Sequence, residues 1–156
     1  MVVYFGADHR GFNLKERLKG FLHDQGYEVV DVGNDRYDEK DDYPDFAVEV
    51  GKRVSLDPEK ARGVLICGSG VGMDVTVNKF PRVRSALAIS SDQVYDARRD
   101  DNVNVLTIAA NFTSQEEAEK MVKTFIGTDF SREERHERRL SKLANVEIKN
   151  EITNPF

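Results

Sequence analysis

Short apolar runs that alternate with helix-like segments constrain the fold of this chain more than any other feature. The apolar runs, each closed by a glycine or a polar turn, are Val2–Phe5, Glu28–Val32, Gly63–Cys67, Ser85–Ile89 and Asn104–Ala109. Between them, apolar residues recur at the three- and four-residue spacing of a helix. Strands that alternate with helices form βαβ units, so the sequence predicts an α/β fold with a parallel sheet covered by helices on both faces.

Capping residues and helix breakers mark where the helices begin. We expect helices to begin near Phe12, Pro44, Gly72, Ser91, Ser114 and Ser131. Ser91 is the expected cap of the helix that runs to about Asp101, and Ser114 the cap of the next one, with Glu117 as its capping-box partner. The segment 34–42 is polar and acidic, which predicts a surface loop.

Size, charge and cysteine content narrow the class of protein. The 156 residues suit one domain, 1–156, and the net charge of −5 disfavours nucleic acid, because a phosphate backbone attracts basic surfaces. The single cysteine excludes an internal disulfide and fits a reducing compartment. No apolar run approaches the roughly 20 residues of a membrane span. The apolar N-terminus is too short for a signal peptide, so we expect no membrane association and a cytoplasmic location.

The strongest candidate site is the loop Gly68-Ser69-Gly70-Val71-Gly72, which directly follows Cys67. Alternating glycines allow a tight turn with inward-pointing N–H groups, and the following helix N-terminus favours an anion. Such a cradle would stabilise a thiolate at Cys67. The plain alternative is a tight turn with a buried cysteine. The spacing excludes a Walker A loop and a dinucleotide G-x-G-x-x-G motif, and Met73 and Asp74 stand where a cysteine phosphatase needs an arginine.

Asp8 and His9 form a second candidate group, directly after the first apolar run. Ligands of parallel sheets bind beyond the carboxyl ends of the strands. If the first and third strands are neighbours, as in the strand order 2-1-3-4-5, His9 faces the glycine loop across the switch point. The plain alternative is that this polar pair only caps the strand end.

The last expected helix is rich in charge and poor in apolar side chains. Its few apolar positions are Leu140, Leu143 and Val146. Such a helix either presents a solvated face or lies across a partner subunit. Arg135 and Arg139 are four residues apart, so they share a helix face and can bind one phosphate, although a salt-bridged surface is the plain alternative.

Taken together, these motifs resemble the ribose-5-phosphate isomerase B family, which also includes galactose-6-phosphate isomerase subunits. The resemblance covers nearly the whole chain. It rests on the stretches Gly6-Ala7-Asp8-His9-Arg10-Gly11-Phe12, Asp42-Tyr43-Pro44-Asp45, Ile66–Gly72, Asn78-Lys79-Phe80, Asn104-Val105-Leu106 and Arg135-His136 with Arg139. It implies a three-layer αβα Rossmann-like domain with a five-stranded parallel sheet. It also implies a homodimer or a dimer of dimers with sites at the subunit interface, in which the C-terminal helix and tail, about 131–156, pack on the partner.

The resemblance further implies an aldose–ketose isomerase of carbohydrate metabolism that interconverts ribose 5-phosphate and ribulose 5-phosphate through an enediolate, with no metal or other cofactor. Cys67 would be the base, and the loop N–H groups with the Ser69 hydroxyl would stabilise the enediolate. His9, Arg135 and Arg139 would hold the phosphate, Asp8 the sugar hydroxyls, and Tyr43 would wall the pocket. The full set of substrate-binding residues would be Asp8, His9, Tyr43, Gly68, Gly70, Val71, Gly72, Asp101, Arg135 and Arg139.

Three positions depart from the family pattern. Members usually carry His-Asn before the fifth strand, and the histidine is credited with opening the furanose ring; here Asp100 and Asp101 take those places. Some members carry an arginine just after the fifth strand, where this chain has Asn111. Asp100 can replace the histidine if burial or the nearby Asp101 raises its pKa. The alternatives are a different aldose phosphate, such as a tetrose or hexose phosphate, and a non-catalytic flavodoxin-like binding module.

Overall fold

The computed structural model describes residues 1–153, with side chains described for residues 1–148. Its elements in chain order are β1 (Val2–Ala7), α1 (Phe12–Asp24), β2 (Glu28–Asp31), α2 (Tyr43–Leu56), β3 (Ala61–Cys67), α3 (Val71–Val77), β4 (Ser85–Ala88), α4 (Ser91–Asp101), β5 (Val105–Ala109), α5 (Gln115–Gly127) and α6 (Glu134–Thr153). The alternation of strands and helices is therefore confirmed. Within the expected C-terminal segment, about 131–156, the last residues, 154–156, lie outside the described residues.

The five strands form one parallel sheet in the order β2-β1-β3-β5-β4. β1 and β3 are neighbours, as the position of His9 required, but β5 rather than β4 lies beside β3, which differs from the order 2-1-3-4-5. The burial of the two strands explains the difference. Every residue of Val105–Ala109 is buried, whereas Ser85–Ala88 is mostly half-buried and takes the edge.

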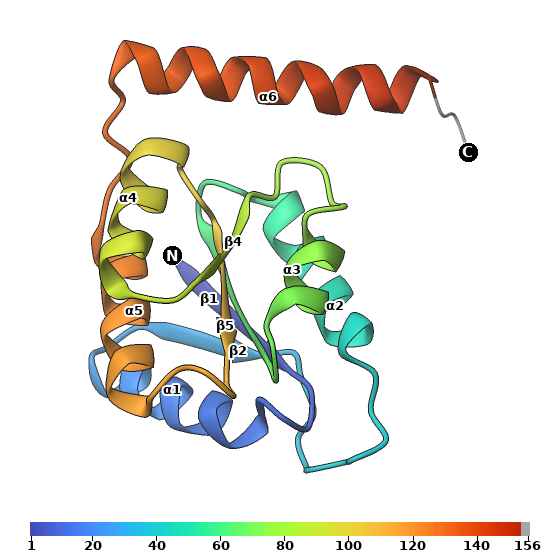
Figure 1. Ribbon diagram of the computed structural model, residues 1–156, viewed down its shortest axis with the longest axis vertical. Coiled ribbons are helices and arrows are strands. Elements are labelled where there is room, and N and C mark those ends of the chain that lie inside the picture. Colours follow the sequence, from blue (N-terminus) through green and yellow to red (C-terminus); the bar gives the residue numbers. More distant parts are fainter. Residues whose placement is uncertain (154–156) are drawn as a thin grey trace.

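Helices cover both faces of the sheet, which confirms the three-layer αβα arrangement (Figure 1). Helices α1, α4 and α5 pack on one face with side chains such as Phe5, Leu18 and Phe125. Helices α2 and α3 pack on the other face, where Cys67 and Met73 belong to the core. Helix α6 lies outside these layers, across one end of the sheet.

Local capping differs in part from the expectation. Ser114 caps α5 by accepting from the N–H of Glu117, as expected, but the Glu117 carboxylate accepts from the N–H of Ser91 instead. Ser90, not Ser91, caps α4, because its hydroxyl accepts from the N–H of Gln93. Helix α6 begins at Glu134 rather than Ser131, since Arg132 has a left-handed backbone with φ of 55°.

No helix within residues 1–153 is both long and apolar enough to cross a membrane.

Candidate active site

The carboxyl ends of β1 and β3 place the turn after β1 beside the glycine loop. The N–H of Asp8 donates to the carbonyl of Ile66 at 3.3 Å, which joins the ends of the two strands. A Cβ at Gly11 would lie only 2.3 Å from the Ile66 carbonyl oxygen, so only glycine allows the turn to approach β3 so closely. Asp8 and His9 are thereby held next to Cys67 and its loop.

The glycine loop wraps around the sulfur of Cys67. Gly70 has a left-handed backbone with φ of 76°, and a Cβ there would lie 2.3 Å from Leu87. This turn aims the N–H of Gly70 at the Cys67 sulfur, which accepts the hydrogen bond at 3.2 Å. The Cys67 side chain faces the core under α3 and is only 4% exposed, whereas Ser69 on the loop is exposed to solvent.

The pKa of the Cys67 thiol is raised, which corrects the expectation that the cradle alone would favour the thiolate. Burial is the largest cause, and the negative charge of Asp8 adds to it. The backbone N–H groups of Met73, Gly70 and Ser69 lower the pKa, but they do not offset burial and Asp8 together. Helix α3, from Val71 to Val77, is only seven residues long. In the isolated chain, Cys67 is therefore a buried thiol with donors already aimed at its sulfur.

Asp8 forms a tight turn with the residues that follow it. One carboxylate oxygen, Oδ1, accepts from the N–H groups of Arg10 and Gly11, each at 3.0 Å. Burial raises the pKa of Asp8 more than these bonds lower it. Because both bonds go to Oδ1, Oδ2 is the oxygen left to meet a ligand. The strand-end cap and the ligand-binding role are therefore compatible in this residue.

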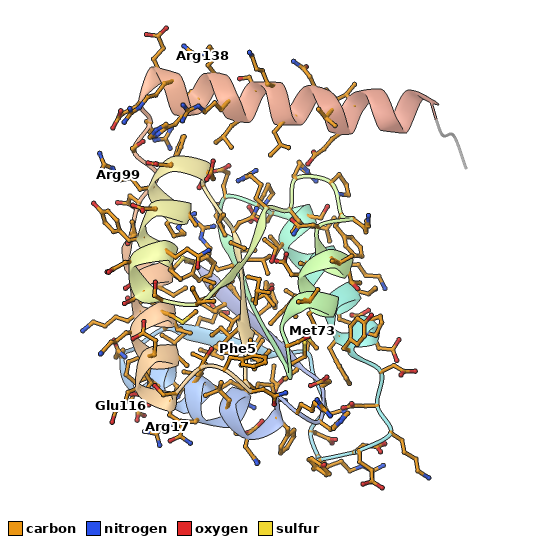
Figure 2. The ribbon with its side chains drawn as sticks, viewed as in Figure 1. Phe5, Arg17, Met73, Arg99, Glu116 and Arg138 are labelled. Carbon is orange, nitrogen blue, oxygen red and sulfur yellow. The ribbon has the colours of Figure 1, made fainter. Side chains whose placement is uncertain are left out.

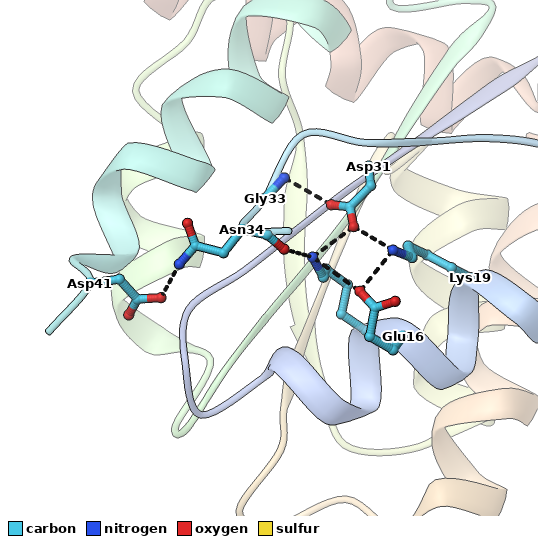
Figure 3. Close-up of polar contacts among 7 residues, drawn as sticks. Glu16, Lys19, Asp31, Gly33, Asn34 and Asp41 are labelled. Carbon is cyan, nitrogen blue, oxygen red and sulfur yellow. Dashed lines mark hydrogen bonds and ion pairs between the residues drawn. The ribbon is translucent and has the colours of Figure 1, made fainter. Parts of the chain in front are cut away.

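His9 is held by a residue that sequence reasoning missed, Asp41. Oδ1 of Asp41 lies 2.7 Å from Nδ1 of the His9 ring and also accepts from the His9 N–H at 3.0 Å. The other oxygen of Asp41 accepts from the Asn34 side chain at 2.6 Å, and the Asn34 carbonyl accepts from the buried Lys15 (Figure 3). With Nδ1 engaged by a carboxylate, the ring presents Nε2 to a ligand. The segment 34–42 is thus more than a solvated loop.

Tyr43 closes the site on the α2 side. A Cβ at Gly72 would lie 2.6 Å from the Tyr43 ring, so the ring packs directly on the end of the glycine loop. The side chain remains exposed on its outer face. The structure therefore brings together these predicted site residues: Asp8, His9, Tyr43, Cys67, Gly68, Ser69, Gly70, Val71 and Gly72.

The remaining predicted site residues lie at the opposite end of the sheet. Helix α4 returns from the carboxyl end of β4 to the amino end of β5, so Asp100 and Asp101 at its end reach the amino edge. In Figure 2, Arg99 and Arg138 lie at the α6 end of the molecule, well away from Met73 beside the glycine loop. One chain by itself does not bring Asp100, Asp101, Arg135 or Arg139 to Cys67.

At that edge, Asp100 contacts a buried histidine. Its Oδ1 lies 3.4 Å from Nδ1 of His136, whose ring is 1% exposed and also lies 2.8 Å from the Ser131 hydroxyl. Arg135 pairs with Glu133 at 2.9 Å, and Glu133 also pairs with Arg99 at 3.1 Å. These contacts attach the first turn of α6 to the end of α4.

A groove separates the rest of α6 from the body of the domain. Its walls include Leu140, Leu143 and Val146 of α6, with Val83 and Val103 opposite. Val146 remains 54% exposed, so this apolar face of α6 is not covered within the chain. No cluster of three or more His, Cys, Asp or Glu side chains that could hold a metal ion occurs within the described part of the chain.

Comparison with known proteins identifies relatives of this arrangement. Residues 3–143 match the Ribose/Galactose Isomerase family. The probable ribose-5-phosphate isomerase B of Mycoplasma genitalium is 37% identical over 149 residues, covering 96% of this chain and 97% of that protein. Ribose-5-phosphate isomerase B of Mycobacterium tuberculosis is 39% identical over 147 residues, covering 94% and 90%.

Solved structures agree with these matches. The crystal structure of the Mycoplasma genitalium enzyme with bound ribulose-5-phosphate has a TM-score of 0.91 and 37% identity, covering 94% of this chain and 95% of the other. Ribose-5-phosphate isomerase B of Clostridium thermocellum has a TM-score of 0.90 and 34% identity, covering 96% and 99%. The fold, the glycine loop and these matches together show that this chain belongs to the ribose/galactose isomerase family.

Proposed function

We propose that this protein interconverts ribose 5-phosphate and ribulose 5-phosphate. The observation that carries the proposal is the position of Cys67, enclosed by the glycine loop and adjacent to the turn of Asp8 and His9. A relative with the same fold holds ribulose-5-phosphate in its crystal structure. A buried base next to an anion cradle suits a reaction whose intermediate carries negative charge on oxygen.

The chemistry needs one base and a set of hydrogen-bond donors. In the aldose, a proton leaves C2, next to the C1 aldehyde, and returns to C1, while a hydroxyl proton moves from O2 to O1. Cys67, as the thiolate, would take and return the carbon-bound proton. The N–H groups of residues 68–72 and the Ser69 hydroxyl would donate to the enediolate oxygens. Removal of one such donor typically costs about 3–4 kcal/mol of transition-state stabilisation.

The raised pKa of Cys67 fits this role in a specific way. Burial disfavours the thiolate, so only a minor fraction is ionised at neutral pH, but that fraction is a stronger base. The N–H groups that already point at the sulfur keep the thiolate accessible. Asp8, with Oδ2 available, would bind sugar hydroxyls, and His9, oriented by Asp41, would donate from Nε2 to the phosphate.

We propose that a second copy of the chain completes the site. Arg135, Arg139, Asp100 and Asp101 lie at the edge opposite Cys67, so only another subunit can bring them to it. The uncovered apolar face of α6, with Val146 and its neighbours, supplies a surface for that contact. The assembly would be a homodimer or a dimer of dimers. The single cysteine of each chain suits the reducing cytoplasm.

A second candidate function is supported by Asp100. Its carboxylate, 42% exposed and paired with His136, stands where family members carry the ring-opening histidine. A substrate that needs no ring opening, such as a tetrose phosphate, or one with a different ring, such as a hexose phosphate, fits this substitution. Asp100→Asn should slow ring-forming sugars more than open-chain ones if Asp100 opens the ring; equal losses on both would rule out that role.

A panel of tetrose, pentose and hexose phosphates tests the proposal. We expect the purified protein to turn over ribose 5-phosphate with the highest kcat/KM, and a Cys67→Ala variant to be almost inactive on every sugar. A preference for a tetrose or hexose phosphate would favour the second candidate. If no sugar phosphate reacts faster with the wild type than with Cys67→Ala, the enzyme assignment is wrong.

A further inference from the structure

Two side chains from different strand ends lie directly on Gly68. A Cβ at Gly68 would be 2.6 Å from Cδ and 3.2 Å from Nη1 of Arg10, and 3.1 Å from Nδ2 of Asn111. Arg10 comes from the turn after β1, and Asn111 from the turn after β5, where its N–H donates to the Gly68 carbonyl at 3.0 Å. The guanidinium of Arg10 therefore lies over the glycine loop, one residue from Cys67.

The guanidinium of Arg10 is positioned but not engaged. Within residues 1–148, whose side chains the structure describes, it makes no hydrogen bond or ion pair, whereas Arg17 and Arg53 pair with Glu119 and Glu49. Its backbone is fixed by the N–H bond to Asp8, and its stem packs on Gly68. The Arg10 residue is exposed to solvent.

The acidic groups nearby already have partners. Asp8 accepts from backbone N–H groups, and Asp41 accepts from His9 and Asn34. These carboxylates make the carboxyl edge unfavourable for a phosphate dianion unless a cation offsets them. Arg10 is a charged side chain that packs on the loop, and a guanidinium presents paired donors that match phosphate oxygens.

We propose that Arg10 binds the phosphate of the sugar phosphate from the same subunit as Cys67. This proposal rests on the proposed function and adds to it an arginine that is not among the predicted site residues. In this chain Arg10, from the turn after β1, and the side-chain amide of Asn111 pack on the same glycine, Gly68. The guanidinium at this glycine therefore comes from position 10, whereas position 111 supplies an amide. In the substrate, the carbon chain of the sugar separates the phosphate from the two reacting carbons. A guanidinium that binds the phosphate should therefore lie beside Cys67 and not in contact with its sulfur.

The first test measures KM and kcat for ribose 5-phosphate, and the inhibition constant of inorganic phosphate, in three proteins. Arg10→Ala should raise KM and the inhibition constant by about ten- to thirtyfold and leave kcat within about twofold, because ground state and transition state both lose the contact. Arg17→Ala removes an exposed arginine on α1 and should change neither (Figure 2). An unchanged inhibition constant in Arg10→Ala would overturn the proposal.

The second test is a rescue from position 111. In the Arg10→Ala background, Asn111→Arg places a guanidinium over the same glycine, so KM and the inhibition constant should return to within about threefold of the wild type. Arg10→Lys keeps the charge without the fork and should lie between wild type and Arg10→Ala. If the rescue fails while Arg10→Lys behaves as the wild type, a fixed guanidinium is not what the site requires, and the proposal is wrong.

A binding measurement separates this proposal from the proposed function. Inorganic phosphate should raise the thermal midpoint of the wild type and of Arg17→Ala more than that of Arg10→Ala. This comparison needs no turnover. Failure of the wild type to act on any sugar phosphate would refute the enzyme assignment alone, whereas equal midpoint shifts in all three proteins would refute the role of Arg10 alone.

Discussion

The two edges of the sheet differ in how far one chain completes them. At the carboxyl edge, Cys67 is 4% exposed, and the loop around it fits its neighbours so closely that a Cβ at Gly70 would overlap Leu87. At the amino edge, α6 is joined to α4 through its first turn, and the apolar face carrying Leu143 and Val146 remains exposed. One chain therefore packs its carboxyl edge closely around Cys67, whereas it leaves the apolar face of α6 at the amino edge uncovered.

The largest effect is expected at the carboxyl edge. Cys67→Ala removes the proposed base and should lower kcat on ribose 5-phosphate by about a thousandfold, within the usual range for a positioned base. The midpoint of unfolding should change little, because the sulfur is the only atom lost from the core. Measured kcat and a thermal scan check both. A loss of activity that merely follows a loss of folded protein would assign Cys67 to the core instead.

Complementation tests whether the two edges meet across subunits. Cys67→Ala and the double variant Arg135→Ala/Arg139→Ala should each be almost inactive alone. Co-expressed with different tags, they should recover about a quarter of the wild-type activity, because half of the dimers are mixed and each mixed dimer contains one complete site. Purification through both tags in series should double that value. Activity no higher than in the parents would mean that each site is built within one chain.

The sequence predicts the two edges of the sheet to different extents. The alternating glycines after a fully apolar run predicted the loop around Cys67, because the pattern is local. The separation of Asp100 from Cys67 also follows from the order of the elements. Asp100 precedes the parallel strand β5 and Cys67 is the last residue of β3, so they lie at opposite edges. The pairing of Asp41 with His9 spans 32 residues, and no spacing in the chain signals it.

The strand order and the state of the thiol could not be read from local patterns. β5 lies inside the sheet because all of Val105–Ala109 is buried, whereas the apolar run at Ser85 gave no sign that it forms an edge. The raised pKa of Cys67 reflects the balance between burial and the N–H donors of Met73, Gly70 and Ser69. That balance depends on the packing of α3 against the sheet, which a sequence pattern does not fix.

Two glycines offer a matched test of how closely the carboxyl edge is fitted. Gly70→Ala forces a side chain into a left-handed backbone against Leu87, so it should destabilise the fold by about 2–4 kcal/mol and lower kcat. Gly20→Ala, on α1 with open space around it, should instead stabilise by about 0.5–1 kcal/mol. Urea unfolding of both variants checks the contrast. Equal effects would show that the loop is looser than its geometry indicates.

The smallest effect concerns the charge beside Cys67. Because burial and Asp8 both raise the pKa of the thiol, the alkylation rate of this single cysteine by iodoacetamide should reach half its maximum at a higher pH than it does for an ordinary exposed cysteine. Asp8→Asn removes a neighbouring negative charge, so the thiolate becomes less unfavourable and the midpoint should move to lower pH.

Asp24→Asn is the matched control for that shift, since Asp24 is an exposed carboxylate at the end of α1. It should leave the midpoint where it is in the wild type. Intact mass after timed alkylation gives the rate, because the chain has one thiol. If the midpoint in Asp8→Asn is the same as in the wild type, burial and not the charge of Asp8 raises the pKa of the thiol. The ends of β1 and β3 would then lie in one site without an effect of the Asp8 charge on Cys67, and Asp8 would act on the substrate only.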